Sequence, residues 1–302
     1  MTVRARASLG VPLGLLFMAI VIGLDCLLLG RLFGHDIPSQ QISFVSFLLG
    51  LLVLVSLPLL AVVAYHTLSC AALRYRVDRN GITIYGAGTQ HTIPMGDLRQ
   101  ILPGDQIQGV ITYRKGLRWP GCERGVGRIP GIGIVRFFAT RPWPDQLLLL
   151  TTGPTFAVSP RTPERFLKAF AARRELGPNR QLEAGVRRAT WLTWPLWTDR
   201  QAWTLIAAAL ILNLALFAFL SILFPGLDLV LPLHYDSQGL ADRFGGKMEM
   251  FALPIIGLIV LATNLVAGLI LYRWEQAGAY LLWGAAVAAQ ILFWVAICSL
   301  LL

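Results

Sequence analysis

The sequence has little charge and few of the residues that carry out chemistry. Only 14% of its 302 residues are charged, against roughly 25% in soluble domains. Its four cysteines are scattered, with no CxxC or Cys/His spacing typical of a zinc site or a disulfide framework. Nucleophile-elbow, P-loop, dinucleotide-binding and His-Glu-x-x-His motifs are also missing. The sequence therefore predicts no catalytic residue, no metal and no cofactor.

Long apolar runs take the place of the missing charge. A bilayer core of about 30 Å needs roughly 20 helical residues, and five segments are long and apolar enough. They are Gly10–Gly30, Phe44–Tyr65, Ala202–Phe224, Phe251–Tyr272 and Ala277–Leu302. The first run lacks a signal-peptide cleavage site, so we expect a retained anchor. The fold class predicted is an α-helical polytopic membrane protein with about five transmembrane helices.

Positive charge is concentrated in the middle of the chain. Between His66 and Gln201 lie 20 of the 26 Lys and Arg but only nine of the 16 Asp and Glu. Because short cytoplasmic segments are enriched in Lys and Arg, this segment and the N-terminus are predicted inside and the C-terminus outside. The expected divisions are 1–72 (two helices), 73–178 (an inserted cytoplasmic domain), 179–201 (a linker) and 202–302 (three helices, with an outer loop at 225–250).

The central domain has the pattern of a β-rich fold closed by one helix. Asn80-Gly81 predicts a type I′ hairpin, and Gly86–Gly88 a second turn. Further strands, expected to be antiparallel, are predicted at Ile132–Ala139, Gln146–Thr151 and Thr155–Val158, after a Gly/Pro-rich loop at Gly116–Gly133. Thr162 and Pro163 then signal the start of an amphipathic helix.

These features resemble the bacterial pleckstrin-homology (PH) domain. The resemblance rests on "NGI", "IPMGDL" and "AVSPRTPERFLKAF", within Leu73–Leu176. It implies a PH-like domain that docks on lipid or protein, in a chain of the bacterial cell (inner) membrane.

A second segment, Leu231–Pro254, resembles a stretch of unknown function found in toxin-immunity membrane proteins. The matching residues are Leu231, Pro232, His234, Gly239, Asp242 and Arg243. His234, Asp236 and Asp242 are conceivable metal ligands, but their spacing favours a turn that starts at Asp236 or Ser237, with Asp242 capping the next segment. The resemblance implies an outer turn that leads into a helix.

A basic stretch inside the domain is the first candidate site. Its members are Arg114, Lys115, Arg118, Arg124, Arg128, Arg136 and Arg141, against Glu123 alone. Beside an anionic leaflet each cation gains about 1 kcal/mol. The competing explanation is the cytoplasmic excess of Lys and Arg without any ligand. A nucleic-acid partner is not expected, because the membrane tether already accounts for the charge.

The linker is the second candidate. Its basic and aromatic residues are Arg187, Arg188, Trp191, Trp194, Trp197 and Trp203. Since Trp prefers the headgroup level, we predict an interfacial anchor, with Trp191 and Trp194 on one face if the segment is helical. The alternative is a structured extension of the domain in which the Trp side chains are core.

Polar residues inside the apolar runs are the third candidate. They are Asp25, Asn213, Asn264 and Gln290. With no second acid or basic partner at similar depth, hydrogen bonds between helices are favoured over a transport path.

The leading hypothesis is a non-enzymatic scaffold or accessory subunit of a membrane complex. Its partners are expected to be the lipid bilayer and other proteins or further copies of the chain. The alternative is an immunity- or signalling-type protein that senses through the outer loop at 231–250. A transporter or membrane enzyme ranks third, because the sequence offers only Asp25 and three amides.

Overall fold

The computed structural model describes residues 1–33, 42–107, 113–115, 118–235 and 241–301. The chain divides into two compact units. The first comprises Met1–Leu24 and Ser56–Thr193, and the second comprises Asp25–Val55 and Trp194–Leu302. Two helices, α1 (Gly10–Phe33) and α2 (Phe44–Ala71), cross the border between the units.

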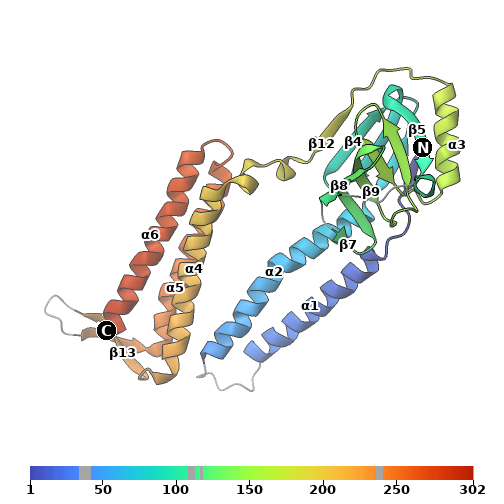
Figure 1. The fold of residues 1–302 in the computed structure, drawn as a ribbon. Helices are drawn as coiled ribbons and strands as arrows, with labels where there is room; N and C mark the ends of the chain where they lie inside the picture. Colours follow the sequence, from blue (N-terminus) through green and yellow to red (C-terminus); the bar gives the residue numbers. More distant parts are fainter. Residues whose placement is uncertain (34–41, 108–112, 116–117, 236–240, 302) are drawn as a thin grey trace. The chain divides into compact units, whose positions relative to one another are not determined.

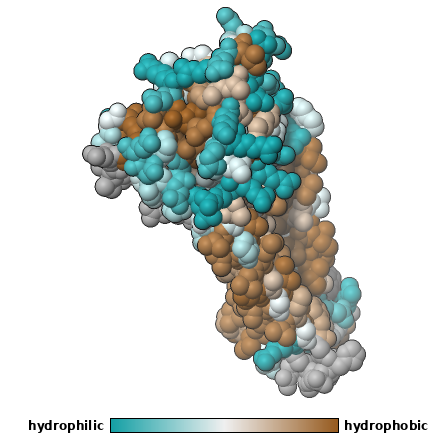
Figure 2. Space-filling model, turned by 90° about the vertical axis from the view of Figure 1, so that its right-hand side faces the viewer, coloured by the Kyte–Doolittle hydropathy of each residue, from teal (hydrophilic) through white to brown (hydrophobic). Residues whose placement is uncertain are grey.

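Five helices in the described residues are long and apolar enough to cross a membrane, which agrees with the sequence prediction. They are α1 (Gly10–Phe33), α2 (Phe44–Ala71), α4 (Arg200–Leu223), α5 (Ala252–Leu271) and α6 (Gln276–Leu301). Their apolar residues cover all sides, and many are exposed. Figure 2 shows this as hydrophobic side chains over the helical part in view and mostly hydrophilic ones over the strand-rich part. A helix apolar all round requires either a protein core or lipid around it.

The first unit contains two β-sheets. The first sheet has the order β1-β2-β3-β4-β12, with every neighbouring pair antiparallel. Its strands are β1 (Thr2–Arg4), β2 (Arg74–Val77), β3 (Gly81–Gly86), β4 (Thr89–Pro94) and β12 (Gly185–Arg188). Two of these strands come from outside residues 73–178. The N-terminal segment pairs with β2, and the predicted linker adds a strand to β4, so both ends of the unit complete one sheet (Figure 1).

The second sheet has the order β5-β10-β11-β9-β8-β6, with β7 also paired to β8. Its strands are β5 (Leu98–Pro103), β6 (Tyr113–Lys115), β7 (Arg118–Trp119), β8 (Cys122–Ile129), β9 (Gly133–Ala139), β10 (Leu147–Thr151) and β11 (Thr155–Val158). The three later strands confirm the sequence prediction. The expected loop at Gly116–Gly133 is wrong, because the segment contains β7 and the eight residues of β8. The expectation of antiparallel pairing throughout is also wrong, since β11 runs parallel to β9.

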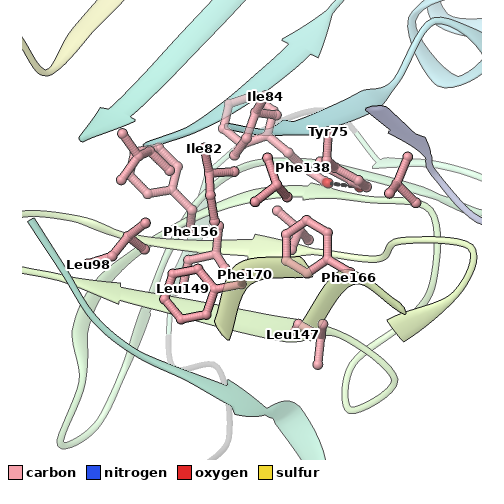
Figure 3. Close-up of a cluster of buried hydrophobic side chains, with 14 of the residues drawn as sticks. Tyr75, Ile82, Ile84, Leu98, Phe138, Leu147, Leu149, Phe156, Phe166 and Phe170 are labelled. Carbon is pink, nitrogen blue, oxygen red and sulfur yellow. Dashed lines mark hydrogen bonds between the residues drawn. The ribbon is translucent and has the colours of Figure 1, made fainter. Parts of the chain in front are cut away.

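The main hydrophobic core lies between the two sheets and the helix α3 (Pro163–Glu175) (Figure 3). Phe166 and Phe170 of α3 are buried there against side chains from both sheets. Thr162 is the N-cap and Pro163 the first helical residue, as the sequence predicted. Tyr75 is fully buried and donates a 2.7 Å hydrogen bond to the Phe138 carbonyl, which ties the first sheet to the second.

Glycine sets the two hairpins of the first sheet in different ways. Gly88, at φ +71°, ends the predicted turn between β3 and β4. The type I′ prediction at Asn80-Gly81 is wrong, since Gly81 lacks a positive φ and is the first residue of β3. Gly81 is required there for another reason: a Cβ atom would lie 2.2 Å from the Ile93 carbonyl oxygen.

In the second unit, α4, α5 and α6 pack against one another. Gly268 of α5 lies against the buried Trp283 of α6, whose indole a Cβ atom would meet at 2.3 Å. A short hairpin, β13 (Val230–Tyr235) and β14 (Ala241–Gly246), joins α4 to α5. The small residue at 268 thus permits the close approach on which helix packing depends when lipid surrounds it.

Candidate functional site

The PH-like part of the first unit is held to the start of α1 by direct hydrogen bonds. The Ser8 hydroxyl donates to the Gly121 carbonyl, and the Gly10 N–H donates to the Ser8 hydroxyl over 3.0 Å. The Trp119 indole N–H donates to the Gly10 carbonyl, also over 3.0 Å. Gly10 fits only because it lacks a side chain, since a Cβ atom would lie 2.0 Å from the Pro120 carbonyl oxygen. The β7–β8 turn is therefore fixed on the helix.

Aromatic side chains extend this junction to α2. The ring of His66 stacks on Trp119 at 5.7 Å, and the ring of Tyr65 meets Trp191 edge-on at 5.9 Å. Both α2 residues are close to the end of the helix that leads into β2. Since Trp favours the boundary between lipid and water, this aromatic group is suited to that level.

Alternation along β8 and β9 places three of the predicted basic residues on one face. Cross-strand neighbours on this face are Arg124 with Phe138, Val126 with Arg136, and Arg128 with Ile134. Phe138 belongs to the core between the sheets. The face that carries the arginines is therefore the inner face of the second sheet, at the part that extends past the core. There Val126 and Ile134 are 41% and 57% exposed.

Strand β12 brings a fourth arginine to the same place. Arg188 lies opposite Thr89 in the β12–β4 register, and Arg124 donates a 3.2 Å hydrogen bond to the Thr89 hydroxyl from the other sheet. We call Arg124, Arg128, Arg136 and Arg188 the arginine face. The sequence analysis separated Arg188 from the others because it follows Arg141 by 47 positions, and only the pairing of β12 with β4 brings them together.

The other predicted basic residues lie elsewhere or outside the described side chains. Arg114 and Lys115 are in β6 and Arg118 is in β7, but their side chains are outside the described part. Arg141 follows β9, and its carbonyl accepts a 2.6 Å hydrogen bond from Gln146, which also donates to Glu123. Arg187 is exposed on β12. The predicted basic stretch therefore contains β-strands rather than a loop. The structure describes the side chains of four of its seven cations.

A groove of about 250 Å³ opens beside the arginine face, between the two sheets. One wall comes from β4 and β12, with His91, Ile93 and Val186. The opposite wall comes from β9 and β11, with Arg136 and Phe156, which are neighbours in the parallel pair. Asp97 and the β10–β11 turn also line it.

His91 is the most unusual residue of this groove, and the sequence analysis did not single it out. It is 7% exposed, and its ring lies 4.6 Å from that of Phe138 and 6.0 Å from that of Phe156. Its Nδ1 is buried and has no hydrogen-bond partner among the described residues. Burial lowers the pKa of His91 to about 4, with further lowering by the guanidinium groups of Arg136, Arg188 and Arg124. His91 is thus a neutral imidazole at pH 7.

The linker does not form the continuous helix considered for Trp191 and Trp194. It contains β12 and two short 3₁₀ turns, Thr190–Leu192 and Pro195–Thr198. Trp194 packs edge-on against Tyr272 at 6.2 Å with Arg273 over its ring, whereas Trp197 and Trp203 stack on each other and remain about half exposed. The linker is thus structured, with exposed tryptophans rather than a tryptophan core.

Polar residues of the last three helices form one buried interhelical connection. Asn213 of α4 donates hydrogen bonds of 3.1 Å to the Gln290 side chain of α6 and to the Pro254 carbonyl of α5. Gln290 in turn donates to the Gly257 carbonyl over 2.8 Å. These bonds join α4, α5 and α6 through buried side chains.

The other two polar residues that were predicted inside the apolar runs differ from that pair. Asn264 donates to the Val260 carbonyl of its own helix over 2.9 Å, so the expectation of a bond to another helix is wrong for it. Asp25 is half-buried in α1.

Asp199, which the sequence analysis passed over, organises the start of α4. It accepts a 3.0 Å hydrogen bond from the Ala202 N–H, as an N-cap. The hydroxyls of Tyr272 and Tyr280 also donate to it. The Tyr280 bond, followed by the Ala202 bond, lowers the pKa of Asp199. An Asp directly before a long apolar run was the signal in the sequence.

The predicted outer loop is largely the β13–β14 hairpin. His234 lies in β13 and Asp242 in β14, with their side chains outside the described part, and Asp236 lies wholly outside it. The capping role predicted for Asp242 therefore lies outside the described side chains, and the Gly246 N–H at the end of β14 donates to Glu249. Arg243 is exposed and lies 3.8 Å from Glu249.

Comparison with known proteins supports the interpretation of the strand-rich part. Residues 73–174 match the family model described as "Bacterial PH domain". No curated protein and no solved structure matched the chain. The matched segment covers β2 to β11 and nearly all of α3, so it contains the second sheet, the closing helix and the first sheet without β1 and β12. Residues 73–174 of this chain are therefore a bacterial PH domain.

Proposed function

We propose that the chain is a non-enzymatic, membrane-anchored docking protein, a scaffold or accessory subunit of a membrane complex. Its five apolar helices span the bacterial inner membrane, with the PH domain on the cytoplasmic side and the C-terminus outside. The domain docks against the inner leaflet and presents a surface to protein partners. PH domains are interaction domains rather than catalytic ones, which accords with the absence of catalytic motifs in the sequence.

The orientation has support from the N-terminus. Residues 2–4 pair with β2, so Arg4 lies in the same sheet as strands of the PH domain. Both are therefore on the same side of α1. Most Lys and Arg lie on this side, and the cytoplasmic side is where short flanking segments accumulate them.

The observation that carries the proposal is the arginine face beside the aromatic junction. Arg124 reaches Thr89 at the β3–β4 turn, and Gly88 of that turn lies against Trp191 and Leu192. Trp191 in turn contacts Tyr65 of α2. Cations and tryptophans are therefore fixed together near one end of a membrane helix. Each cation held at an anionic leaflet contributes about 1 kcal/mol, so the face favours docking there.

Quantitative mass spectrometry of the full chain, purified in gentle detergent or nanodiscs from its native membrane, tests the proposal. The test variant carries Arg124→Gln, Arg136→Gln and Arg188→Gln. The matched control removes three exposed cations near and on α3, as Arg161→Gln, Arg165→Gln and Lys168→Gln.

We expect stoichiometric partner proteins, or enriched anionic lipid, with the wild type and the control but not with the test variant. A homogeneous particle with neither partners nor anionic lipid would contradict the proposal.

A second candidate, sensing of a ligand outside the membrane, is favoured by the β13–β14 hairpin. Its exposed apolar residues include Val230 at 61% and Phe244 at 63%. If the hairpin is the sensor, Phe244→Ser and Arg243→Gln abolish the cellular response while the chain still inserts and retains its partners. A response that survives both substitutions argues against this candidate.

A further inference from the structure

A groove of about 320 Å³ lies along the last two turns of α5, wholly within the second unit. Val266, Leu269 and Ile270 line it, and their i, i+3, i+4 spacing places them on one face of the helix. Arg273, just past the end of α5, and two tryptophans complete the lining. We call this feature the α5 groove. It therefore runs from an apolar helix face to a single cation.

The apolar part of the α5 groove has the length and exposure to hold an acyl chain. Val266 and Ile270 are 56% and 54% exposed, on a helix long and apolar enough to cross a membrane. Lipid chains are the natural neighbours of such a face. At a rise of ~1.5 Å per residue, the distance from Val266 to Arg273 is about 10 Å, or about two thirds of one leaflet of a ~30 Å core.

The polar end of the α5 groove carries an open cation. The Arg273 guanidinium lies 5.6 Å from the centre of the Trp194 ring, and Trp194 itself packs edge-on against Tyr272. In the described part of the chain, the Arg273 side chain donates no hydrogen bond and forms no ion pair. A guanidinium binds a phosphate through two parallel hydrogen bonds. Since tryptophan favours the headgroup level, this donor is suited to a lipid phosphate.

The nearby carboxylates do not belong to the α5 groove. Glu275 lies by the first turn of α6, where its Cγ is 3.5 Å from the position of a Cβ atom on Gly278. Asp199 already accepts hydrogen bonds from Ala202 and two tyrosines. Among the described lining residues Arg273 alone is charged, so a headgroup ammonium has no partner there. The groove thus selects the phosphate and not the rest of the headgroup.

We propose that the α5 groove binds one phospholipid of the inner leaflet, with its phosphate on Arg273 and one acyl chain along the apolar face. The inference rests on the membrane insertion and orientation in the proposed function, but needs neither the arginine face nor a protein partner. Because only the phosphate is recognised, this lipid is separate from the enrichment of anionic lipid expected of the arginine face. Since Trp194 belongs to the linker, the bound lipid would also stabilise the contact between the linker and α5.

Native mass spectrometry of the full chain, delipidated in a maltoside detergent, tests the proposal. The dissociation constant of the first bound lipid is measured for dioleoylphosphatidylcholine and for dioleoylglycerol, which has the same chains but no phosphate. We expect the phospholipid to bind about tenfold more tightly, as one charge-assisted hydrogen bond provides. Arg273→Gln should remove this difference by weakening phosphatidylcholine binding alone.

Three further variants separate the groove from general attraction. Ile270→Trp fills the groove and keeps every charge, and should weaken the binding of both lipids. Arg200→Gln is the matched control: it removes an exposed cation at the start of α4, which Asp199 and Tyr272 place at the same end of the bundle, outside the groove lining. It should leave both affinities unchanged. The variant with Arg124, Arg136 and Arg188 changed to Gln should also bind phosphatidylcholine as the wild type does.

Four results would overturn the proposal. The wild type could bind both lipids equally, or Arg273→Gln and Arg200→Gln could weaken binding equally. Phosphatidylcholine binding could be lost in the triple arginine variant, which would assign the lipid to the arginine face. A wild-type dimer that Ile270→Trp converts to a monomer would assign the groove to a second copy of the chain.

Extraction of the membranes with alkaline carbonate distinguishes this proposal from the proposed function. Release of the wild-type chain would overturn both, because neither holds without insertion. A chain that stays in the membrane but does not prefer the phospholipid would overturn the α5 groove alone.

Discussion

The Tyr75 hydroxyl donates a 2.7 Å hydrogen bond to the Phe138 carbonyl, and so joins the two sheets of the PH domain through their shared core. The same hydroxyl accepts a 3.1 Å hydrogen bond from the Ser159 N–H. Tyr75 is in the second strand of the first sheet, whereas Phe138 lies in the second sheet and Ser159 directly follows its strand β11. One buried oxygen therefore connects three segments that are distant in sequence.

Removing this oxygen should weaken the domain without altering its shape. Tyr75→Phe leaves the Ser159 N–H and the Phe138 carbonyl without this partner, at a cost of about 1–3 kcal/mol. Thermal unfolding of the full chain in detergent, followed by near-ultraviolet circular dichroism, measures the change. Tyr85→Phe, on the half-buried end of β3, is the control and should have little effect. Equal melting of both variants would show that the buried hydrogen bonds contribute nothing.

The Asn213–Gln290 connection predicts a measurable stability of the last three helices. Asn213→Ala removes hydrogen bonds to two other helices, and should destabilise the bundle by about 0.6–2 kcal/mol. Asn264→Ala is the matched control and should be close to neutral, because among the described residues Asn264 donates to a carbonyl of its own helix. Unfolding in mixed micelles of increasing SDS content provides both values. Similar losses for the two variants would contradict a specific interhelical role.

Close packing of α5 on α6 predicts opposite outcomes for two glycines. Gly268→Ala places a Cβ atom 2.3 Å from the Trp283 indole, and should cost about 1–3 kcal/mol through overpacking. Gly284→Ala adds a Cβ atom with no atom of the described residues within 4 Å, and should be neutral or stabilising by up to ~1 kcal/mol. The same SDS titration compares them. A Gly268→Ala variant as stable as the wild type would mean that the helices do not approach this closely.

The low pKa of His91 predicts an acid-sensitive PH domain. In the folded chain the pKa of His91 is about 4, against 6.5 for the unfolded residue, so the unfolded chain binds more protons between these values. Stability is therefore full above about pH 6.5 and falls by roughly 2–3 kcal/mol as the pH drops towards 4. His91→Leu should remove this pH dependence, whatever its effect at pH 7.

Melting temperatures of the two chains at pH 7 and pH 4.5 give the comparison. The other histidines and the carboxylates are common to both chains, so their contributions cancel in the difference. A wild type and a His91→Leu variant with the same loss of melting temperature at pH 4.5 would rule out His91 as the acid-sensitive group.

The sequence identified many residues of the candidate site, but it did not predict which of them lie together in space. Arg124, Arg128 and Arg136 stood out as cations within a short stretch. Arg188 was placed with the linker tryptophans, and His91 was not considered, because a lone histidine in a strand pattern has no local signal. Arg188 joins the other arginines because β12 pairs with β4, and His91 lies near them because the two sheets pack together. Both relationships link residues that are far apart in the sequence.

The sequence by itself determined the local features of this protein. Five apolar runs specify five helices, the Thr162-Pro163 pair specifies the start of α3, and Gly88 specifies a turn, because each depends on neighbouring residues alone. The tertiary structure decided which strands pair. It added β1 and β12 to the first sheet and set β11 parallel to β9, since strand pairing joins residues across long stretches of chain and leaves no short-range pattern. For the same reason it alone placed an unpaired imidazole and a guanidinium on opposite walls of one groove.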